Sequence, residues 1–207
     1  IGTITDHPKL LDLVNPDFSQ ISQDFPVVNP EAGNKMKEAI KIIHSEGDSL
    51  GGIVECVIRG IPAGIGGPLF GGMEGKIAQI VYGIPAVKGL VFGDTQTTGS
   101  ENNDAFTMEN GRPVKKTNHS GGILGGLSDG STIMVRAHVK PTPSISATQQ
   151  TVNKSGEEIE ISIGGRHDPI IVPRAVVVVE AMAAITILDA LLENMSSRVD
   201  RIVEFYK

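Results

Sequence analysis

Two glycine pairs lie close together in Thr117–Ser128 and make it the most informative segment for binding. Glycine lacks a Cβ atom, so backbone amides at such positions can approach a planar or anionic group closely. The same composition is also typical of a tight corner between two strands. The local pattern supports both interpretations equally.

Two further clusters add charged groups to the candidate chemistry. Lys140–Ser144 offers one cation, two hydroxyls and two prolines that stiffen the loop, as a phosphate or carbonyl site would need. In Gly164–Pro169, Arg166 can hold a phosphate through two hydrogen bonds, and Asp168 can accept a proton or orient a base. Turns without function often share both compositions, so local chemistry leaves open whether either cluster is a site.

Other site signatures are incomplete or absent in the sequence. Gly64–Leu69 resembles a dinucleotide-binding fingerprint, but Leu69 occupies the third glycine position and Pro68 lacks an N–H for the phosphate. No Walker loop, metal-type Cys/His spacing or nucleophile elbow occurs, and the five histidines lie in unrelated settings. A dinucleotide site of this type is therefore not expected.

The composition is that of an ordinary soluble globular protein, with 40% hydrophobic and 20% charged residues among 207. A chain of this length can bury roughly 70% of its unfolded surface, so a real core is expected. The net charge of −6 gives no basic footprint for nucleic acid or an anionic membrane surface. Cys56 is the only cysteine, which excludes an intrachain disulfide and fits a reducing compartment.

Local signals predict the elements that would position these clusters. Asn29 is a suitable N-cap, Pro30 suits the first helical position and Gly47 suits a left-handed end. We therefore expect a helix from Pro30 to about Glu46. The other expected elements are strands at Gly51–Arg59, Val87–Phe92 and Glu158–Ile163, and helices at Met73–Tyr82 and Pro173–Met195.

The clearest alternation of apolar and polar side chains lies in Thr132–Val139 and predicts a strand with one buried face. The inward residues should be Ile133, Val135, Ala137 and Val139. Met134 should face the other way. Residues 93–120 are polar and rich in Gly and Asn, which predicts a long surface excursion, and such loops are more often functional than idle.

The last helix is apolar almost all round, since its polar residues between Ala175 and Leu192 are Glu180, Thr186 and Asp189. A membrane span needs about 20 such residues. The two acidic side chains lie on opposite faces, and each would cost about 2.5–3.5 kcal/mol at the centre of a bilayer. We therefore expect a soluble helix covered on both sides. The predicted fold class is α+β, a β-α-β sandwich with helices packed between two largely antiparallel sheets.

Taken in order, the clusters resemble the C-terminal portion of the chorismate synthase family, from about Gly51 to Leu192. The matching blocks are Gly51–Glu55, Pro62–Gly64, Ile84–Gly89, Gly99–Ser100, Asn103–Asp104, Asn118–Ser128, Lys140–Thr142, Gly165–Pro169, Pro173–Ala175 and Val179–Met182. Two departures are minor: Gly67 stands where the family usually has Glu, and Ile170 where it favours a small residue. So many ordered blocks make the resemblance highly specific.

The resemblance implies an enzyme, a carbon–oxygen lyase that converts 5-enolpyruvylshikimate 3-phosphate to chorismate and phosphate with reduced FMN. This is the last step of the shikimate pathway, which leads to the aromatic amino acids. The residues implied to contact FMN are Pro85, Ala86, Gly125, Lys140, Pro141, Thr142, Pro143, Ser144 and Arg166. Asp168 matches an Asp proposed to help the flavin take the substrate proton. The family assembles as a homotetramer, and its flavin is reduced either with the enzyme's own NADPH activity or by an external source.

The family also has an N-terminal half with a Gly-Glu-Ser-His-Gly motif and a second essential histidine. None of the five histidines here lies in such a motif. We therefore expect residues 1–207 to be a single domain, the C-terminal part of the enzyme, and inactive when isolated. The alternatives are a non-catalytic flavin-binding module and an oligomerisation module. The expected partner is the small-molecule substrate, with no nucleic acid and no membrane, in the cytoplasm.

Overall fold

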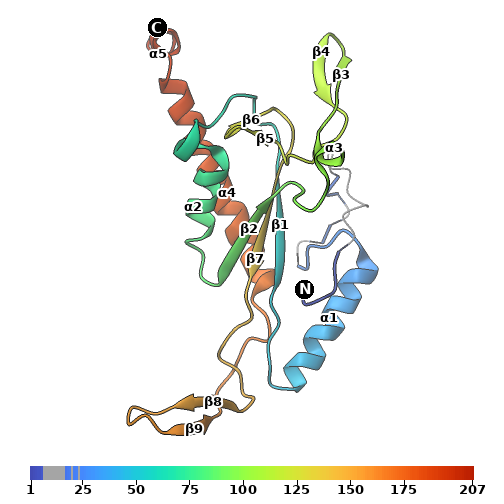
Figure 1. Ribbon diagram of the computed structural model, residues 1–207, viewed down its shortest axis with the longest axis vertical. Helices are drawn as coiled ribbons and strands as arrows, with labels where there is room; N and C mark the ends of the chain where they lie inside the picture. The colour runs from blue at the N-terminus through green and yellow to red at the C-terminus, as the bar shows by residue number, and fades with distance from the viewer. Residues whose placement is uncertain (7–16, 20, 23) are drawn as a thin grey trace.

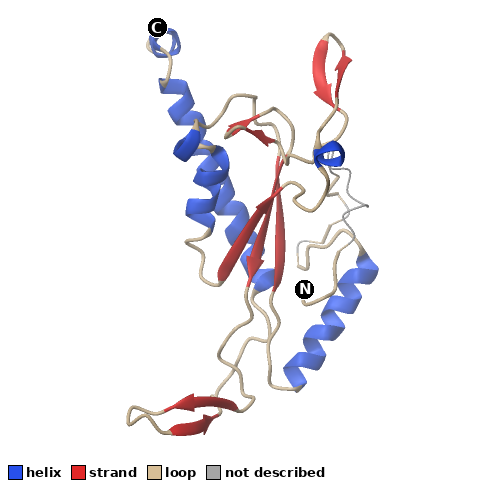
Figure 2. Ribbon diagram, viewed as in Figure 1, coloured by secondary structure: helices blue, strands red, loops and turns tan. Residues whose placement is uncertain are grey.

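The computed structural model describes residues 1–6, 17–19, 21–22 and 24–207. A central sheet has helices against one face, and two hairpins project from opposite ends of the molecule (Figures 1 and 2). The elements in chain order are α1 (Pro30–Ser45), β1 (Gly52–Ile58), η2 (Leu69–Gly71), α2 (Met73–Val81), β2 (Val87–Phe92), α3 (Gly99–Asn102), β3 (Phe106–Glu109), β4 (Arg112–Lys115), β5 (Ile123–Leu124), β6 (Leu127–Ser128), β7 (Ile133–Val139), β8 (Gln149–Val152), β9 (Glu158–Ile161), α4 (Val172–Ser196) and α5 (Val199–Phe205).

Helix α1 begins and ends as its capping residues predict. The Asn29 side chain accepts hydrogen bonds from the amides of Glu31 and Ala32, which would otherwise have no partner in the first turn. Pro30 fills the first helical position. Gly47 follows the helix with φ +71°, a conformation that favours glycine. The expected helix is confirmed to within one residue at its C-terminal end.

The central sheet has three antiparallel strands in the order β1-β7-β2. Strand β7 lies in the middle, so its backbone pairs with Cys56 of β1 and Phe92 of β2 on either side of Val135. The four residues expected to face inward on β7 are all buried: Ile133, Val135, Ala137 and Val139.

Met134, which was expected to face the other way, is nevertheless buried, with only 2% of its surface exposed. A distant part of the chain reaches this end of β7: the amide of Met134 donates to the carbonyl of Gly121 at 3.2 Å. A long-range contact of this kind leaves no trace in the local alternation of apolar and polar residues.

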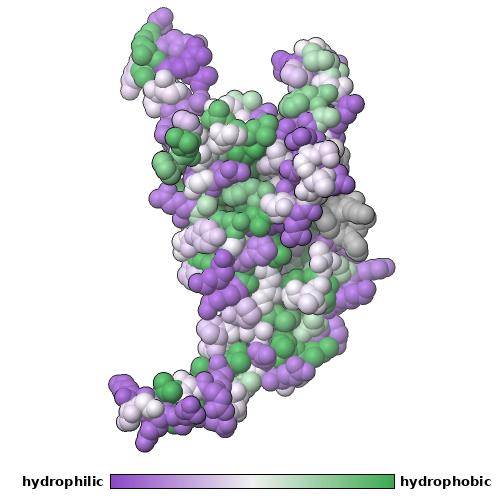
Figure 3. All heavy atoms as spheres, in the orientation of Figure 1, coloured by the Kyte–Doolittle hydropathy of each residue, from purple (hydrophilic) through white to green (hydrophobic). Residues whose placement is uncertain are grey.

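The inner face of the sheet packs against α2 and α4 (Figure 1). Met73, Ile77 and Val81 recur at helical spacing on α2 and are fully buried. On α4 the buried residues include Val179, Ile187 and Ala190. Together with the inner residues of β7 they form one continuous core. Hydrophobic side chains also reach the surface in the region of α2 and β2 (Figure 3).

The expected cover on both sides of α4 is wrong for the described residues, because the other face of this helix is open. Val177 is 64% exposed, and Leu188 is 58% exposed. Within the described residues one sheet packs on this helix, together with α2. By length and composition alone α4 could also cross a membrane. The mixed α+β class with antiparallel sheets is confirmed.

The expected polar excursion at residues 93–120 has regular structure of its own. Helix α3 is short and carries a capping box between Thr98 and Glu101. Strands β3 and β4 then form a hairpin that projects from the body of the molecule (Figure 1). Its two-residue turn is Asn110–Gly111, both with positive φ, as a primed hairpin turn requires.

Candidate functional site

Two of the predicted cofactor segments meet where β7 ends and β2 begins. The amide of Lys140 donates to the carbonyl of Ala86 at 2.9 Å. Ala86 has φ +72°, which a residue with a Cβ adopts only at a cost of order 1–3 kcal/mol. Pro85 and Lys140 are both exposed beside it. The structure therefore brings Pro85, Ala86 and Lys140 together.

The cluster around Asp168 lies at the same end of the sheet. The carbonyl of Pro169 accepts the amide of Leu50 at 2.8 Å, just before β1 begins. The hydroxyl of Ser49, the preceding residue, donates to the carbonyl of Thr142 at 2.7 Å. One short segment thus contacts both the Lys140–Ser144 loop and the residue after Asp168.

The two charged residues of this cluster are accessible. Arg166 is exposed, and Asp168 forms an ion pair with Arg174 in the first turn of α4. The side chains of Asp168 and Arg174 are both at least half exposed. His167 lies between Arg166 and Asp168 in the sequence, and its Nε2 atom contacts the carbonyl of Ile163 at 2.7 Å.

Gly125 lies elsewhere. It is in the β5–β6 turn with φ +60°, and open space surrounds the position where a Cβ would stand. The next residue, Gly126, accepts the amide of Met73 at the start of α2, whereas Ala86 lies beyond the end of that helix. Gly125 is thus at the opposite end of the sheet from Lys140 (Figure 1).

The other glycine pair serves a tight corner. A Cβ on Gly121 would lie 2.5 Å from the amide nitrogen of Gly93, and one on Gly122 would lie 2.5 Å from the carbonyl oxygen of Thr132. Both have positive φ. Thr117–Ser128 could be a ligand-binding segment or a tight corner between strands. Gly121 and Gly122 form such a corner, whereas Gly125 has the open surroundings that a ligand would need.

A buried ionic cluster that the sequence analysis missed holds this corner in place. The Lys115 side chain is 5% exposed and pairs with Asp104, 3.2 Å away, and with Asp129. Asp104 is 4% exposed and also accepts the amides of His119 at 2.7 Å and Ser120 at 3.1 Å. Asn103–Asp104 belongs to a family block, but no local signal identifies Lys115 as its partner.

Hydrogen bonds decide the ionisation of these carboxyls. Burial acts to raise the pKa of Asp104, but hydrogen bonds from Thr117, Ser120 and His119 outweigh it and hold the pKa well below its ordinary value. Burial likewise opposes ionisation of Asp129, and its bond from Lys115 leads the contacts that lower its pKa. Both are therefore charged at neutral pH.

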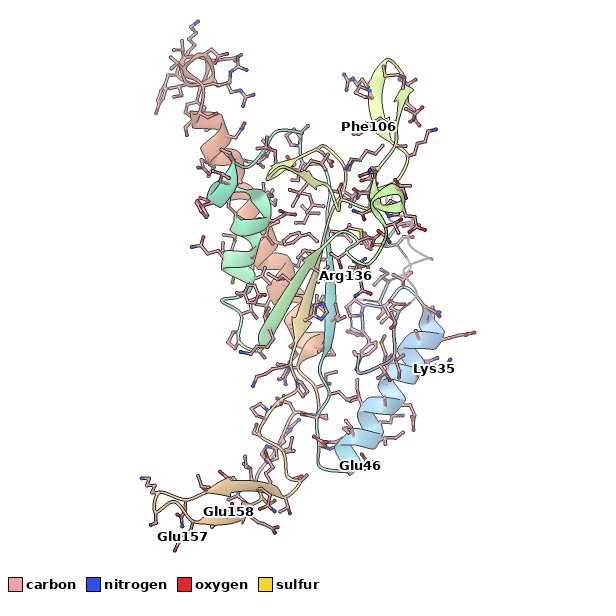
Figure 4. The ribbon with its side chains drawn as sticks, in the orientation of Figure 1. Lys35, Glu46, Phe106, Arg136, Glu157 and Glu158 are labelled. Atoms are coloured by element: carbon pink, nitrogen blue, oxygen red, sulfur yellow. The ribbon has the colours of Figure 1, made fainter. Side chains whose placement is uncertain are left out.

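A second group of polar side chains lies on the sheet face that α2 and α4 leave uncovered. Arg136, which Figure 4 labels on β7, donates to Glu55 at 2.6 Å and to the carbonyl of Gly93 at 2.9 Å. His119 contacts Asp94 through Nδ1 at 2.7 Å. An open cavity of about 230 Å³ is lined by Val91, Gly93, Asp94, Thr95, Gln96, Thr97 and Arg136.

The lone cysteine and the metal-ligating residue types offer no further site in the described part of the chain. Burial raises the pKa of the Cys56 thiol to about 11, with a smaller contribution from the Glu180 carboxylate. The thiol is therefore not a nucleophile near neutral pH. No group of three or more His, Cys, Asp or Glu side chains in the described residues could hold a metal ion.

These features define a mixed α+β protein whose charged loops gather at one end of an antiparallel sheet. A sequence model of the chorismate synthase family matches residues 3–192. The chain therefore belongs to the chorismate synthase family, and the resemblance seen in its sequence is confirmed.

Individual relatives agree with this assignment. The chain is 54% identical over 205 residues to the chorismate synthase of Agathobacter rectalis, covering 97% of this chain and 56% of that protein. It is 54% identical over 153 residues to that of Archaeoglobus fulgidus, covering 72% and 42%. A crystal structure of chorismate synthase superposes with a TM-score of 0.67 at 28% identity, covering 87% of this chain and 48% of that one. The chain spans about half the length of the relatives it matches.

Proposed function

We propose that this chain is one half of an enzyme that converts 5-enolpyruvylshikimate 3-phosphate to chorismate and phosphate with reduced FMN. The family match over residues 3–192 carries the proposal. The geometry supports it, because the charged and strained residues of three family blocks meet at one end of the sheet: Ala86, Lys140 and Asp168, the last through Pro169.

The residues at this end fit a phosphorylated, planar cofactor. The hydroxyl oxygen of Thr142 is buried and has no partner within the protein, although a buried hydroxyl normally requires one. Lys140 and Arg166 are exposed cations that can bind a phosphate. Thr142, Lys140 and Arg166, with the backbone of Ala86, would hold FMN. When bound, reduced FMN supplies electron density that assists the loss of phosphate and is returned with the ring proton.

The chain's own residues have distinct roles in this proposal. Lys140 and Arg166 neutralise phosphate charge and orient the bound groups. Asp168 would help the cofactor site take the ring proton of the substrate, because a carboxylate can accept a proton or orient the group that does. Its ion pair with Arg174 holds the carboxylate near the start of α4. Pro141 and Pro143 stiffen the loop between them, and Ser144 ends it. Gly125 lies at the other end of the sheet, where the open space around its Cβ position leaves room for a ligand.

The remaining half of the family's length would complete the fold and the site. The open face of α4 has apolar or small residues at alternating intervals of three and four, the pattern of a face that packs on another element. They are Val178, Ala181, Ile185, Leu188, Leu192 and Met195. We propose that the other half covers this face as the second sheet-bearing layer. The whole protein would assemble as a homotetramer in the cytoplasm, without nucleic acid or membrane.

Replacing Asp168 by asparagine in the complete enzyme should lower turnover by about 10²-fold, the lower range for loss of a general acid or base. The affinity for FMN should stay within about twofold of wild type, because Asn keeps the shape of the side chain. Asp200→Asn is the matched control, since Asp200 forms an equally exposed pair with Arg198. Steady-state turnover and flavin titration measure the two quantities.

The outcomes distinguish the alternatives. Equal turnover in Asp168→Asn and wild type would refute the role of Asp168. Flavin binding without turnover in the complete wild-type protein would favour a non-catalytic flavin-binding module. An oligomerisation module predicts no flavin response, and no effect of Arg166→Ala beyond stability.

A further inference from the structure

In the connection from α1 to β1, the last five residues, Gly47–Gly51, form what we call the strap. Its first carbonyl, that of Gly47, accepts the amides of Ser146 at 3.0 Å and Ala147 at 3.1 Å. These two residues follow the Lys140–Ser144 loop. Farther along the strap, Leu50 donates its amide to the carbonyl of Pro169. The strap is thus bonded to both segments that flank the β8–β9 hairpin, although they lie more than 90 residues away.

Both ends of the strap require glycine. A Cβ on Gly51 would lie 2.6 Å from the carbonyl oxygen of Val139 and 3.0 Å from the nitrogen of Pro141. Gly47 has φ +71°, and a Cβ there would lie 2.4 Å from the hydroxyl of Ser146. The strap therefore lies in backbone contact with the Lys140–Ser144 loop, where a side chain would push the two apart.

Ser49 is the residue of the strap whose side chain acts on the loop. It is 8% exposed, and its hydroxyl donates to the carbonyl of Thr142 at 2.7 Å. The backbone of Thr142 is fixed by this bond, while its own buried hydroxyl has no partner in the protein. The prolines on either side of Thr142 have no N–H and cannot fix the loop through amide bonds. The Ser49 bond supplies the constraint that they cannot.

We propose that Ser49 is a positioning residue for the cofactor loop. By holding the Thr142 carbonyl, it aims the free Thr142 hydroxyl and sets the position of Lys140–Ser144 relative to Asp168. This inference rests on the proposed function, because it takes Lys140–Ser144 to be the loop that binds FMN. It assigns a role to a residue that itself touches neither cofactor nor substrate.

The test compares Ser49→Ala with Ser45→Ala in the complete enzyme. Ser45 is a matched control, because its hydroxyl also donates to a backbone carbonyl at 2.7 Å, that of Ile42, on an exposed helix end. Ser49→Ala should weaken FMN binding about fivefold, the effect of one hydrogen bond. It should also change the visible circular dichroism of bound FMN. Amide exchange at Leu50 and Ser146, whose amides bond the strap to Pro169 and carry the far side of the loop onto Gly47, should accelerate by a similar factor when measured without FMN.

Each outcome bears on the proposal. Unchanged amide exchange in Ser49→Ala would overturn it, whatever happens to FMN binding. Faster exchange with an FMN affinity within twofold of wild type would also overturn it, because Ser49 would then stabilise the fold without positioning the site. If the wild-type enzyme itself did not bind FMN, the proposed function would fail first. The exchange data identify that case, since they report on the strap without the cofactor.

Discussion

Replacing Gly93 by alanine should destabilise the chain by about 3 kcal/mol, the sum of backbone strain and forced overpacking. The new Cβ would lie 2.1 Å from the carbonyl oxygen of His119 and 2.8 Å from the amide nitrogen of Gly121. Both neighbours are backbone atoms, so no side chain can rotate away. Gly93 also has φ +58°, which alanine tolerates poorly. The corner that joins residues 93–94 to the glycine-rich loop would have to open.

Gly60→Ala separates the two causes. Gly60 has φ +77°, but nothing lies within 4 Å of the position of its Cβ. Its substitution should cost about 1 kcal/mol, the cost of the backbone conformation alone. Urea unfolding followed by circular dichroism gives both free energies. Equal losses in the two variants would show that the close approach at Gly93 relaxes without cost.

Asp104→Ala should lower the free energy of unfolding by about 4 kcal/mol, as expected when one partner of a buried ion pair is removed. Lys115 would keep Asp129 but lose its contact with Asp104, while the amides of His119 and Ser120 would lose their acceptor. Asp200→Ala, which removes an exposed ion pair with Arg198, should leave the urea midpoint near that of wild type. Similar midpoints for both variants would contradict the importance assigned to the buried cluster.

The same carboxyl predicts a dependence on pH. The pKa of Asp104 is lower in the folded chain than its ordinary value, so the folded state binds its proton less tightly than the unfolded state. Its contribution is present above about pH 4 and is lost as the pH falls below that value. Asp104→Ala should therefore reduce the loss of stability between about pH 4 and pH 2. Unfolding curves at several pH values would detect the change in slope.

The elements that the sequence predicts well are those whose signals are local. The N-cap at Asn29 and the left-handed Gly47 delimit α1, and the alternation at Thr132–Val139 identifies the buried face of β7. The Asn110–Gly111 turn was equally readable, because this dipeptide is the strongest short-range hairpin signal. Residues 93–120 were nevertheless expected to be an irregular excursion, so a usable signal was missed there.

The features that the sequence does not predict depend on contacts between residues far apart in the chain. The end of β7 at Met134 is bonded to the distant Gly121, and the Lys115–Asp104 pair joins the end of a hairpin to the residue before it. The separation of Gly125 from Lys140 follows from the length of α2 and β7, which sequence blocks in linear order do not reveal. The one-sided packing of α4 depends on its contacts with α2 and β1, which an almost entirely apolar helix sequence does not reveal.

We propose that this chain carries the FMN-binding loops of a chorismate synthase. The most direct measurement is an anaerobic titration of reduced FMN with the chain, with and without 5-enolpyruvylshikimate 3-phosphate, repeated with the other half of the enzyme restored. We predict a change in the flavin spectrum that sharpens with substrate. Arg166→Ala should lower the affinity for FMN about tenfold, because one charge-assisted contact is lost. A flavin spectrum that stays unchanged with both the chain and the complete protein would contradict the claim.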